Sequence, residues 1–357
     1  MRIVLGPLAC LSMFLVACGS GGRTVSTDPQ PSDSTSDIVG GPLLQVVTTA
    51  VKVDREAGAP RLSFEVLVFD EAGDPLLGLD ANGLALRADG KDLAGTWTVR
   101  GFREAGGTVE LAVLIPNHQS YTDPVELGEN LTWTAIKAVM EGVTAVVAAM
   151  PNRDRVATYM YDDHGVAPYA PWQSRETALD ALQAIPDGPP GRPEIWQLPR
   201  FYQALDTVAQ SFGPMMTTYP TLPTRRIVLS VTDGKDTLHD DVRAVDRAVH
   251  ATIDGLNAQR VLPWFLGFTL DVPDTLVQMH MVASKTDGRY QEVAPEDWAD
   301  LTDRIIRFGT AINSGFVITF TPAPGTKLLD TVRELRLTID AGNAIGRDFV
   351  HQVKVAP

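Results

Sequence analysis

The sequence predicts an α/β fold with a doubly wound, mostly parallel sheet, inserted in or flanked by a β-sandwich built from both chain ends. Near-continuous apolar strands alternate with helix-like segments over residues 105–312, which is typical of a parallel sheet covered on both faces. Residues 42–104 show strand and turn patterns without helices, and so do residues 313–357. Because the few strands at the C-terminal end would make a poor domain alone, we infer that both ends join in one sandwich.

The first sandwich segment, residues 42–104, contains β-branched and alternating apolar runs. Strands are expected at 44–53, 62–69 and 95–102. Residues 84–91 place Asp89-Gly90 directly after an alternating run, which is a signal for a tight hairpin.

Residues 105–312 supply the predicted α/β domain. Its strands are expected at 108–115, 155–161, 226–232, 260–268 and 288–293. Its helices are expected at 131–150, 174–185, 200–212, 240–258, 273–284 and 296–312. The C-terminal segment returns to strands at 315–322, 334–340 and 351–356.

The N-terminus has the layout of a cleaved export signal. An apolar run from Ile3 to Ala17 is too short to span a bilayer stably and is followed at once by Gly/Ser-rich sequence. The last four residues before the predicted cut, Leu15 to Cys18, resemble the bacterial lipobox. This resemblance implies that residues 1–17 are a signal peptide and that Cys18 carries a diacylglycerol and a further acyl chain such as palmitate. The alternative is an ordinary secretory signal with an incidental cysteine.

Residues 18–41 are predicted to be a lipidated flexible linker, because they hold almost nothing apolar to bury. By resemblance to the sorting rules of diderm bacteria, Gly19 after the cysteine indicates the outer membrane. The chain has only two cysteines, and Cys10 would be lost on cleavage. The mature chain therefore has no disulfide framework and no cysteine-based metal site. The formal charge of −14 disfavours nucleic acid as a partner.

Several segments in the right order resemble the von Willebrand factor A family. The strongest is RRIVLSVTDGKDT at 225–237, which is similar to that family's fourth strand and its TDG turn. The others are Asp154-Arg155-Val156, RETALDALQAI (175–185), FYQALDTV (201–208), TDGRYQEV (286–293) and EDWADLTDRI (296–305). The flanking residues 68–91 resemble the β-domain of A-domain-related secreted bacterial proteins.

The resemblance implies a metal-ion-dependent adhesion site, and this sequence departs from it. The aspartate that begins the family's D-x-S-x-S loop is replaced by Pro116, and the first serine by His118, whereas Ser120 is retained. The threonine position falls at or near Pro199, and Asp233 is retained in the TDG turn. Mg²⁺ requires several oxygen ligands, so we expect a degenerate site, no metal and no cofactor.

A rebuilt metal site is the competing interpretation. His118, Asp233 and Asp236 could meet at one edge, with the Asp162-Asp163-His164 turn nearby, and such a set suits Zn²⁺ or Mn²⁺. Equally, Asp162 to His164 form a solvated turn, Asp233 accepts backbone hydrogen bonds in its turn, and His118 is an exposed loop residue. The sequence leaves both interpretations open.

Hydrolase, nucleotide-binding and metalloprotease signatures are absent from the sequence, so no enzyme activity is expected. The predicted function is binding of a protein or envelope ligand at the carboxyl edge of the sheet, where open α/β sheets bind ligands. Candidate partner contacts are Asn117, Trp196, Lys235 and Asp236. One alternative is a scaffold subunit of an envelope complex that pairs through the sandwich. Another is a hydrolase with a rebuilt metal site.

Overall fold

The computed structural model describes most of the chain from residue 43 onwards. The described ranges are 43–46, 52–54, 61–69, 74–117, 125–126, 132–162, 165–184, 200–213, 224–234, 236, 242–268, 274–326, 335–339 and 349–353. All of them belong to the compact unit Ser32–Pro357. The predicted signal peptide and linker, including Cys18, lie outside the described residues. Among the described residues, no helix is both long enough and apolar enough to cross a membrane.

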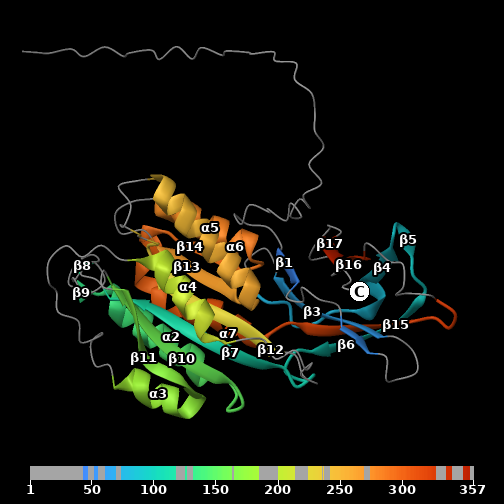
Figure 1. Cartoon of the computed structure of the whole chain (residues 1–357). Helices are drawn as coiled ribbons and strands as arrows, with labels where there is room; N and C mark the ends of the chain where they lie inside the picture. The colour runs from blue at the N-terminus through green and yellow to red at the C-terminus, as the bar shows by residue number, and fades with distance from the viewer. Residues whose placement is uncertain are drawn as a thin grey trace, which may run out of the picture. The chain divides into compact units, whose positions relative to one another are not determined.

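A six-stranded sheet forms the centre of the α/β lobe (Figure 1). Its strands are parallel except for the edge strand β11, which pairs antiparallel with β10. In spatial order they are β11 (Gly165–Ser174), β10 (Arg155–Asp162), β7 (Thr108–Pro116), β12 (Thr224–Thr232), β13 (Leu262–Phe268) and β14 (Arg289–Val293). The predicted fold class is therefore confirmed.

Helices cover both faces of this sheet, because its strands send alternate side chains into two apolar cores. On β7, Leu111 and Val113 face one core, and Ala112 and Leu114 face the other. The first core is closed by α2 (Ala135–Ala148), α3 (Arg175–Gln183) and α7 (Leu301–Thr310). The second is closed by α4 (Phe201–Ser211), α5 (Val242–Gln259) and α6 (Asp274–Lys285).

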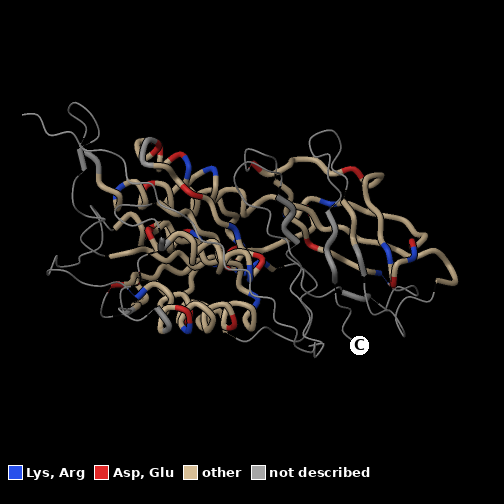
Figure 2. The backbone as a smooth tube through the Cα atoms, turned by 90° about the horizontal axis from the view of Figure 1, so that it is seen from above, with Lys and Arg blue, Asp and Glu red and all other residues tan. Residues whose placement is uncertain are grey.

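The sandwich takes strands from both chain ends. Its first sheet has the order β1 (Leu43–Val46), β3 (Arg61–Phe69), β15 (Phe316–Pro322) and β6 (Gly95–Gly101), with β2 (Lys52–Asp54) also on β3. Its second sheet has the order β17 (Phe349–Val353), β16 (Leu335–Ile339), β4 (Leu84–Ala88) and β5 (Lys91–Asp92). The two sheets share one apolar core. Figure 2 shows acidic and basic residues interspersed over the described elements of both lobes.

Three short 3-10 helices complete the described elements of these two lobes. They are η1 (Ala81–Gly83), η2 (Pro295–Asp300) and η3 (Ala311–Asn313).

Several element predictions need correction. The expected strand 44–53 is two short strands, β1 and β2, which both pair with β3. The extended strand β11 was not predicted, because Pro168 and Pro171 interrupt its pattern; proline is tolerated there since β11 is an edge strand. The helix expected from residue 131 begins at Ala135, after the hairpin β8 (Val125–Glu126) and β9 (Thr132–Trp133). The expected last helix divides into η2, α7 and η3, and the last strand lies earlier, at Phe349–Val353.

Arginines at the amino edge of the sheet bind the carbonyls at which helices end. In this fold the helices run antiparallel to the strands, so their carboxyl ends, with unpaired carbonyls, collect at that edge. Arg226 donates to carbonyls after α4 and at the end of α5. Arg175 donates to two carbonyls at the end of α2, and Arg289 to Phe308 of α7. These hydrogen bonds fix the carboxyl ends of the helices to the amino edge of the sheet.

Candidate functional site

The candidate site is the carboxyl edge of the sheet between β7 and β12. The chain moves from β7 to β10 on one side and later to β12 on the other side, so the strand order reverses between β7 and β12. Such a reversal opens a crevice where α/β sheets bind ligands. The hairpin β8–β9 leaves β7 at this edge and leads into α2, as Figure 1 shows. Sequence analysis missed this hairpin, because its strands have only two residues each.

Pro116 ends β7 at this site and lies opposite Tyr161 of β10 in the parallel ladder. The next residue, Asn117, is half-buried and donates its amide N–H to the carbonyl of Tyr161 at 2.9 Å. Pro116 therefore ends β7 within the ladder, and Asn117 continues its pairing with β10. A proline side chain there offers no oxygen to a cation.

The hydroxyl of Tyr161 lies beside the TDG turn. It is 2.7 Å from the hydroxyl of Thr232, and that hydroxyl accepts the amide N–H of Gly234 at 3.1 Å. Tyr161 is fully buried, and Asp233 is 1% exposed. Burial raises the pKa of Tyr161 well above its usual 10.0, and the charge of Asp233 raises it further. Near neutral pH the hydroxyl therefore keeps its proton.

Aromatic rings fill the space behind this turn. Tyr161 packs against Phe201 of α4 with ring centroids 5.6 Å apart, and Phe201 packs against Phe265 of β13 at the same distance. Burial also raises the pKa of Tyr202, whose hydroxyl donates to Gln278 of α6 at 3.3 Å. These four aromatic side chains are fully buried and belong to the second apolar core of the lobe.

Asp236, predicted as a partner contact, holds the start of α4. Its carboxylate accepts the amide N–H of Tyr202 at 2.9 Å, and its backbone pairs with Arg200. Arg200, the N-cap residue, makes no side-chain capping bond. A carboxylate at this end also interacts favourably with the helix dipole. Asp236 therefore fixes the loop after β12 to α4.

The described residues do not fit an octahedral Mg²⁺ site. Pro116 supplies no ligand, and the hydroxyl of Thr232 is engaged by Tyr161 and Gly234. Within the described ranges, no group of three or more His, Cys, Asp or Glu side chains is placed to hold a metal ion. His118, Ser120, Pro199, Trp196 and Lys235 lie outside the described residues, as do Asp163 and His164. Asp162 is half-buried at the end of β10.

No protein-family model and no curated protein matches the sequence. Solved structures do resemble it, among them a von Willebrand factor type A protein from Catenulispora acidiphila, with 10% identity, coverage of 88% of this chain and 73% of that chain, and a TM-score of 0.40. The PilB minor pilin from Streptococcus sanguinis has 8% identity, coverage of 76% and 78%, and a TM-score of 0.42. The SpRpn10 VWA domain has 12% identity, coverage of 56% and 94%, and a TM-score of 0.38. The fold class itself rests on the strand order and the helix placement.

Proposed function

We propose that this chain is a non-enzymatic, lipid-anchored cell-envelope protein of the von Willebrand A type. It binds a protein or envelope ligand through the carboxyl edge of the α/β lobe, without a metal ion. The observation that carries the proposal is the edge between β7 and β12. It lies where the strand order reverses, which is the ligand position of open α/β sheets, and Pro116 at the end of β7 offers no side-chain oxygen to a cation.

Recognition at this edge rests on shape and polar contacts. Asn117 follows β7, the hairpin β8–β9 is inserted before α2, and the loop around Lys235 follows β12. The segment with Trp196 precedes α4, whose amino end lies at the same edge through Asp236. Aromatic residues are enriched in binding interfaces, so Trp196 is the residue that we expect to contribute most.

The chain connectivity supports presentation of this edge to a partner. The predicted linker leads into the sandwich, and the sandwich contacts the amino edge of the sheet through the Arg225–Glu65 ion pair. The carboxyl edge is the opposite end of the same strands. A ligand bound there would not compete with the sandwich for surface.

The lipobox-like segment Leu15 to Cys18 supports the anchor, and Gly19 supports placement in the outer membrane of a diderm bacterium. The test is labelling of growing cells with a palmitate analogue. The wild-type chain should carry the label and be recovered in the membrane fraction. The Cys18→Ala chain should be unlabelled and absent from the membrane fraction. A labelled Cys18→Ala chain would contradict the anchor.

The binding test uses residues 24–357, which retain the whole compact unit Ser32–Pro357. The purified chain is crosslinked to envelope extract of the bacterium that encodes it, with EDTA or with Mg²⁺. We expect a crosslinked product that is equal in EDTA, and that is lost in Trp196→Ala and Asn117→Ala. Arg87→Ala, on an exposed part of the sandwich, is the matched control. Dependence on Mg²⁺ would contradict metal-free binding.

A scaffold that pairs through the sandwich is the second candidate. It is favoured by β6, which ends its sheet and has exposed residues alternating with half-buried ones. If Thr98→Pro in β6 abolishes the crosslink and the Trp196 and Asn117 variants do not, the sandwich is the binding surface.

A further inference from the structure

Two segments connect the sandwich with the α/β lobe, and they lie side by side. The chain leaves the sandwich between β6 and β7 and returns between η3 and β15. The amide N–H of Phe102 in the first segment donates to the carbonyl of Gly315 in the second at 2.8 Å. Two adjacent connections are the usual construction of a hinge. Relative motion of two lobes is the default expectation unless they share an apolar interface, and here Leu67 and Phe69 of β3 belong to the first core of the α/β lobe.

Arg225 at the amino end of β12 contacts both connections and both lobes. Its guanidinium donates to the carbonyls of Ile312, at 2.9 Å, and Ser314, at 2.6 Å. It forms an ion pair with Glu65 of β3. The guanidinium carbon lies 3.7 Å from the centroid of the Phe102 ring.

The pair is deeply buried, since the side chains of Arg225 and Glu65 are 0% and 10% exposed. Burial lowers the pKa of Arg225, and the charge of Glu65 raises it again. A buried charge that loses its partner is costly, because neither water nor another group replaces the lost interaction. A rotation that separated β3 from β12 would break the ion pair and leave both charges buried without a counter-ion, which is unfavourable in free energy.

Gly315, in the connection that returns to the sandwich, is closely packed. Its φ of +95° is open to glycine, and a Cβ atom there would lie 2.5 Å from the carbonyl oxygen of Val66 and 2.8 Å from Arg225. The segment between η3 and β15 therefore packs tightly between Val66 of β3 and Arg225.

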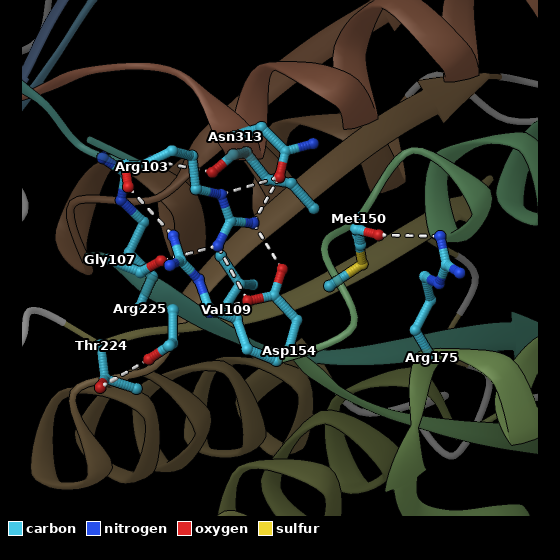
Figure 3. A network of polar contacts seen from close by, with 12 residues as sticks. Arg103, Gly107, Val109, Met150, Asp154, Arg175, Thr224, Arg225 and Asn313 are labelled. Atoms are coloured by element: carbon cyan, nitrogen blue, oxygen red, sulfur yellow. Dashed lines mark hydrogen bonds and ion pairs between the residues drawn. The ribbon is translucent and has the colours of Figure 1, made fainter. Parts of the chain in front are cut away.

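Arg103, in the segment between β6 and β7, makes a second set of contacts with the α/β lobe. It bonds to the carboxylate of Asp154, which precedes β10, and to the amide oxygen of Asn313 in η3, as Figure 3 shows. It also donates to the carbonyl of Gly107 at 2.9 Å. Both connections are thus bound to the amino edge of the sheet.

From this geometry we propose that the Arg225–Glu65 pair is a lock between the two lobes, which keeps the two connections from acting as a hinge. The sandwich and the α/β lobe move as one rigid body, and a force or displacement applied to the sandwich reaches β12 directly. This inference does not depend on the proposed binding function.

The test measures the distance between spin labels on the two lobes. Residues 24–357 contain neither of the two cysteines of the chain, so Lys91→Cys in β5 and Lys285→Cys in α6, both exposed positions, label one site in each lobe. With native Arg225 and Glu65, we expect one narrow distance. Replacing the pair with Glu65→Leu and Arg225→Met removes both charges together, which preserves folding better than removing one. This variant should lose the narrow distance and give a broad distribution well below its unfolding temperature.

The matched controls are Asp92→Asn, within the sandwich, and Asp74→Asn, which breaks the exposed ion pair between Asp74 and Arg307 across the lobes. Both should keep the narrow distance. A broad distribution with the native pair, or a narrow one in the folded double variant, overturns the proposal. If the double variant does not fold, Glu65→Asp replaces it, because the shorter side chain keeps the charge but does not reach Arg225. A broad distance distribution in the folded Glu65→Asp variant supports the proposal, and a narrow one overturns it.

Discussion

The carboxylate of Asp154 holds the guanidinium of Arg103 through two hydrogen bonds, of 2.8 and 2.5 Å, and accepts the amide N–H of Val109 at 2.9 Å. Asp154 begins the Asp-Arg-Val segment that resembles the von Willebrand A family. In this chain it joins the start of β10 to the start of β7 and to the connection that leaves the sandwich.

The first prediction concerns this carboxylate. Asp154→Ala leaves Arg103, which is 19% exposed, without its counter-ion and should lower the free energy of unfolding by about 3 kcal/mol. Urea denaturation measures the effect. The control Asp92→Asn breaks an ion pair with side chains 51% and 73% exposed and should change stability by less than about 1 kcal/mol. Equal effects of the two variants would mean that Asp154 does not hold the connection.

The second prediction concerns alkaline stability. The pKa of Tyr161 is raised in the folded state, so above pH 10 the unfolded chain ionises this group and the folded chain does not. The folded state then binds more protons, and stability falls as pH rises. Relative to wild type, Tyr161→Phe should remove about 1.4 kcal/mol of that loss per pH unit above pH 10.

The measurement for Tyr161→Phe is urea denaturation at a series of pH values from 7 to 11. Near pH 7 the variant should be less stable by about 1 kcal/mol, because it lacks the hydrogen bond to Thr232. Comparison with wild type cancels the other titrating groups. Parallel stability profiles of the two proteins above pH 10 would show that Tyr161 ionises normally.

The third prediction compares two glycines with positive φ. Gly325→Ala, at φ +86° with no atom near the new Cβ, should cost about 1 kcal/mol from backbone strain alone. Gly315→Ala adds contacts with Val66 and Arg225 and should cost at least about 2 kcal/mol more. Thermal unfolding separates the two variants. A cost for Gly315→Ala as small as that for Gly325→Ala would show that the connection has room to shift.

The fourth prediction compares two glycines within helices. Alanine is favoured over glycine in a helix by about 1 kcal/mol, and Gly255→Ala in α5 should gain most of it, since only the flexible carboxylate of Asp206 is near. Gly142→Ala in α2 would bring Cβ to 2.7 Å from Cβ of Ile305 in α7, and overpacking of about 1–3 kcal/mol should exceed the gain. Denaturant unfolding should therefore give opposite signs for the two variants.

The fifth prediction concerns metals. The thermal midpoint of residues 24–357 should be the same in EDTA and in millimolar Mg²⁺, Mn²⁺, Ca²⁺ or Zn²⁺. A metal bound only by the folded state, at 100 times its dissociation constant, would add about 2.7 kcal/mol. Stabilisation that disappears in His118→Ala or Asp233→Ala would establish a rebuilt site and bring metal-dependent adhesion or hydrolysis back as functions.

Local patterns of this sequence predicted much of its secondary structure. Asp89-Gly90 indicated a hairpin, and both residues have positive φ, of 48° and 79°, between β4 and β5. The run 226–232 indicated a buried strand, and it forms all of β12 except its first two residues. These signals are local because hydrophobic periodicity and turn chemistry depend on residues close in the chain.

The sequence predicted where β7 and β12 end, and not the contacts that are made there. The order of strands and helices indicated a carboxyl edge near Pro116 and Asp233, and both residues are there. The contact of Tyr161 with Thr232 was not predicted, because the two residues are 71 positions apart. Nothing in the local sequence distinguishes this buried tyrosine from any other tyrosine in a strand.

By itself, the sequence determined the alternation of strands and helices and the turn residues, and it placed at Pro116 a side chain without an oxygen for a cation. Only the tertiary structure decided that β6 pairs with β15, and that Glu65 meets Arg225 across 160 residues. Both residues look like ordinary strand charges in the sequence. Their partnership depends on the packing of two lobes, because burial and counter-charge arise only when distant segments come together.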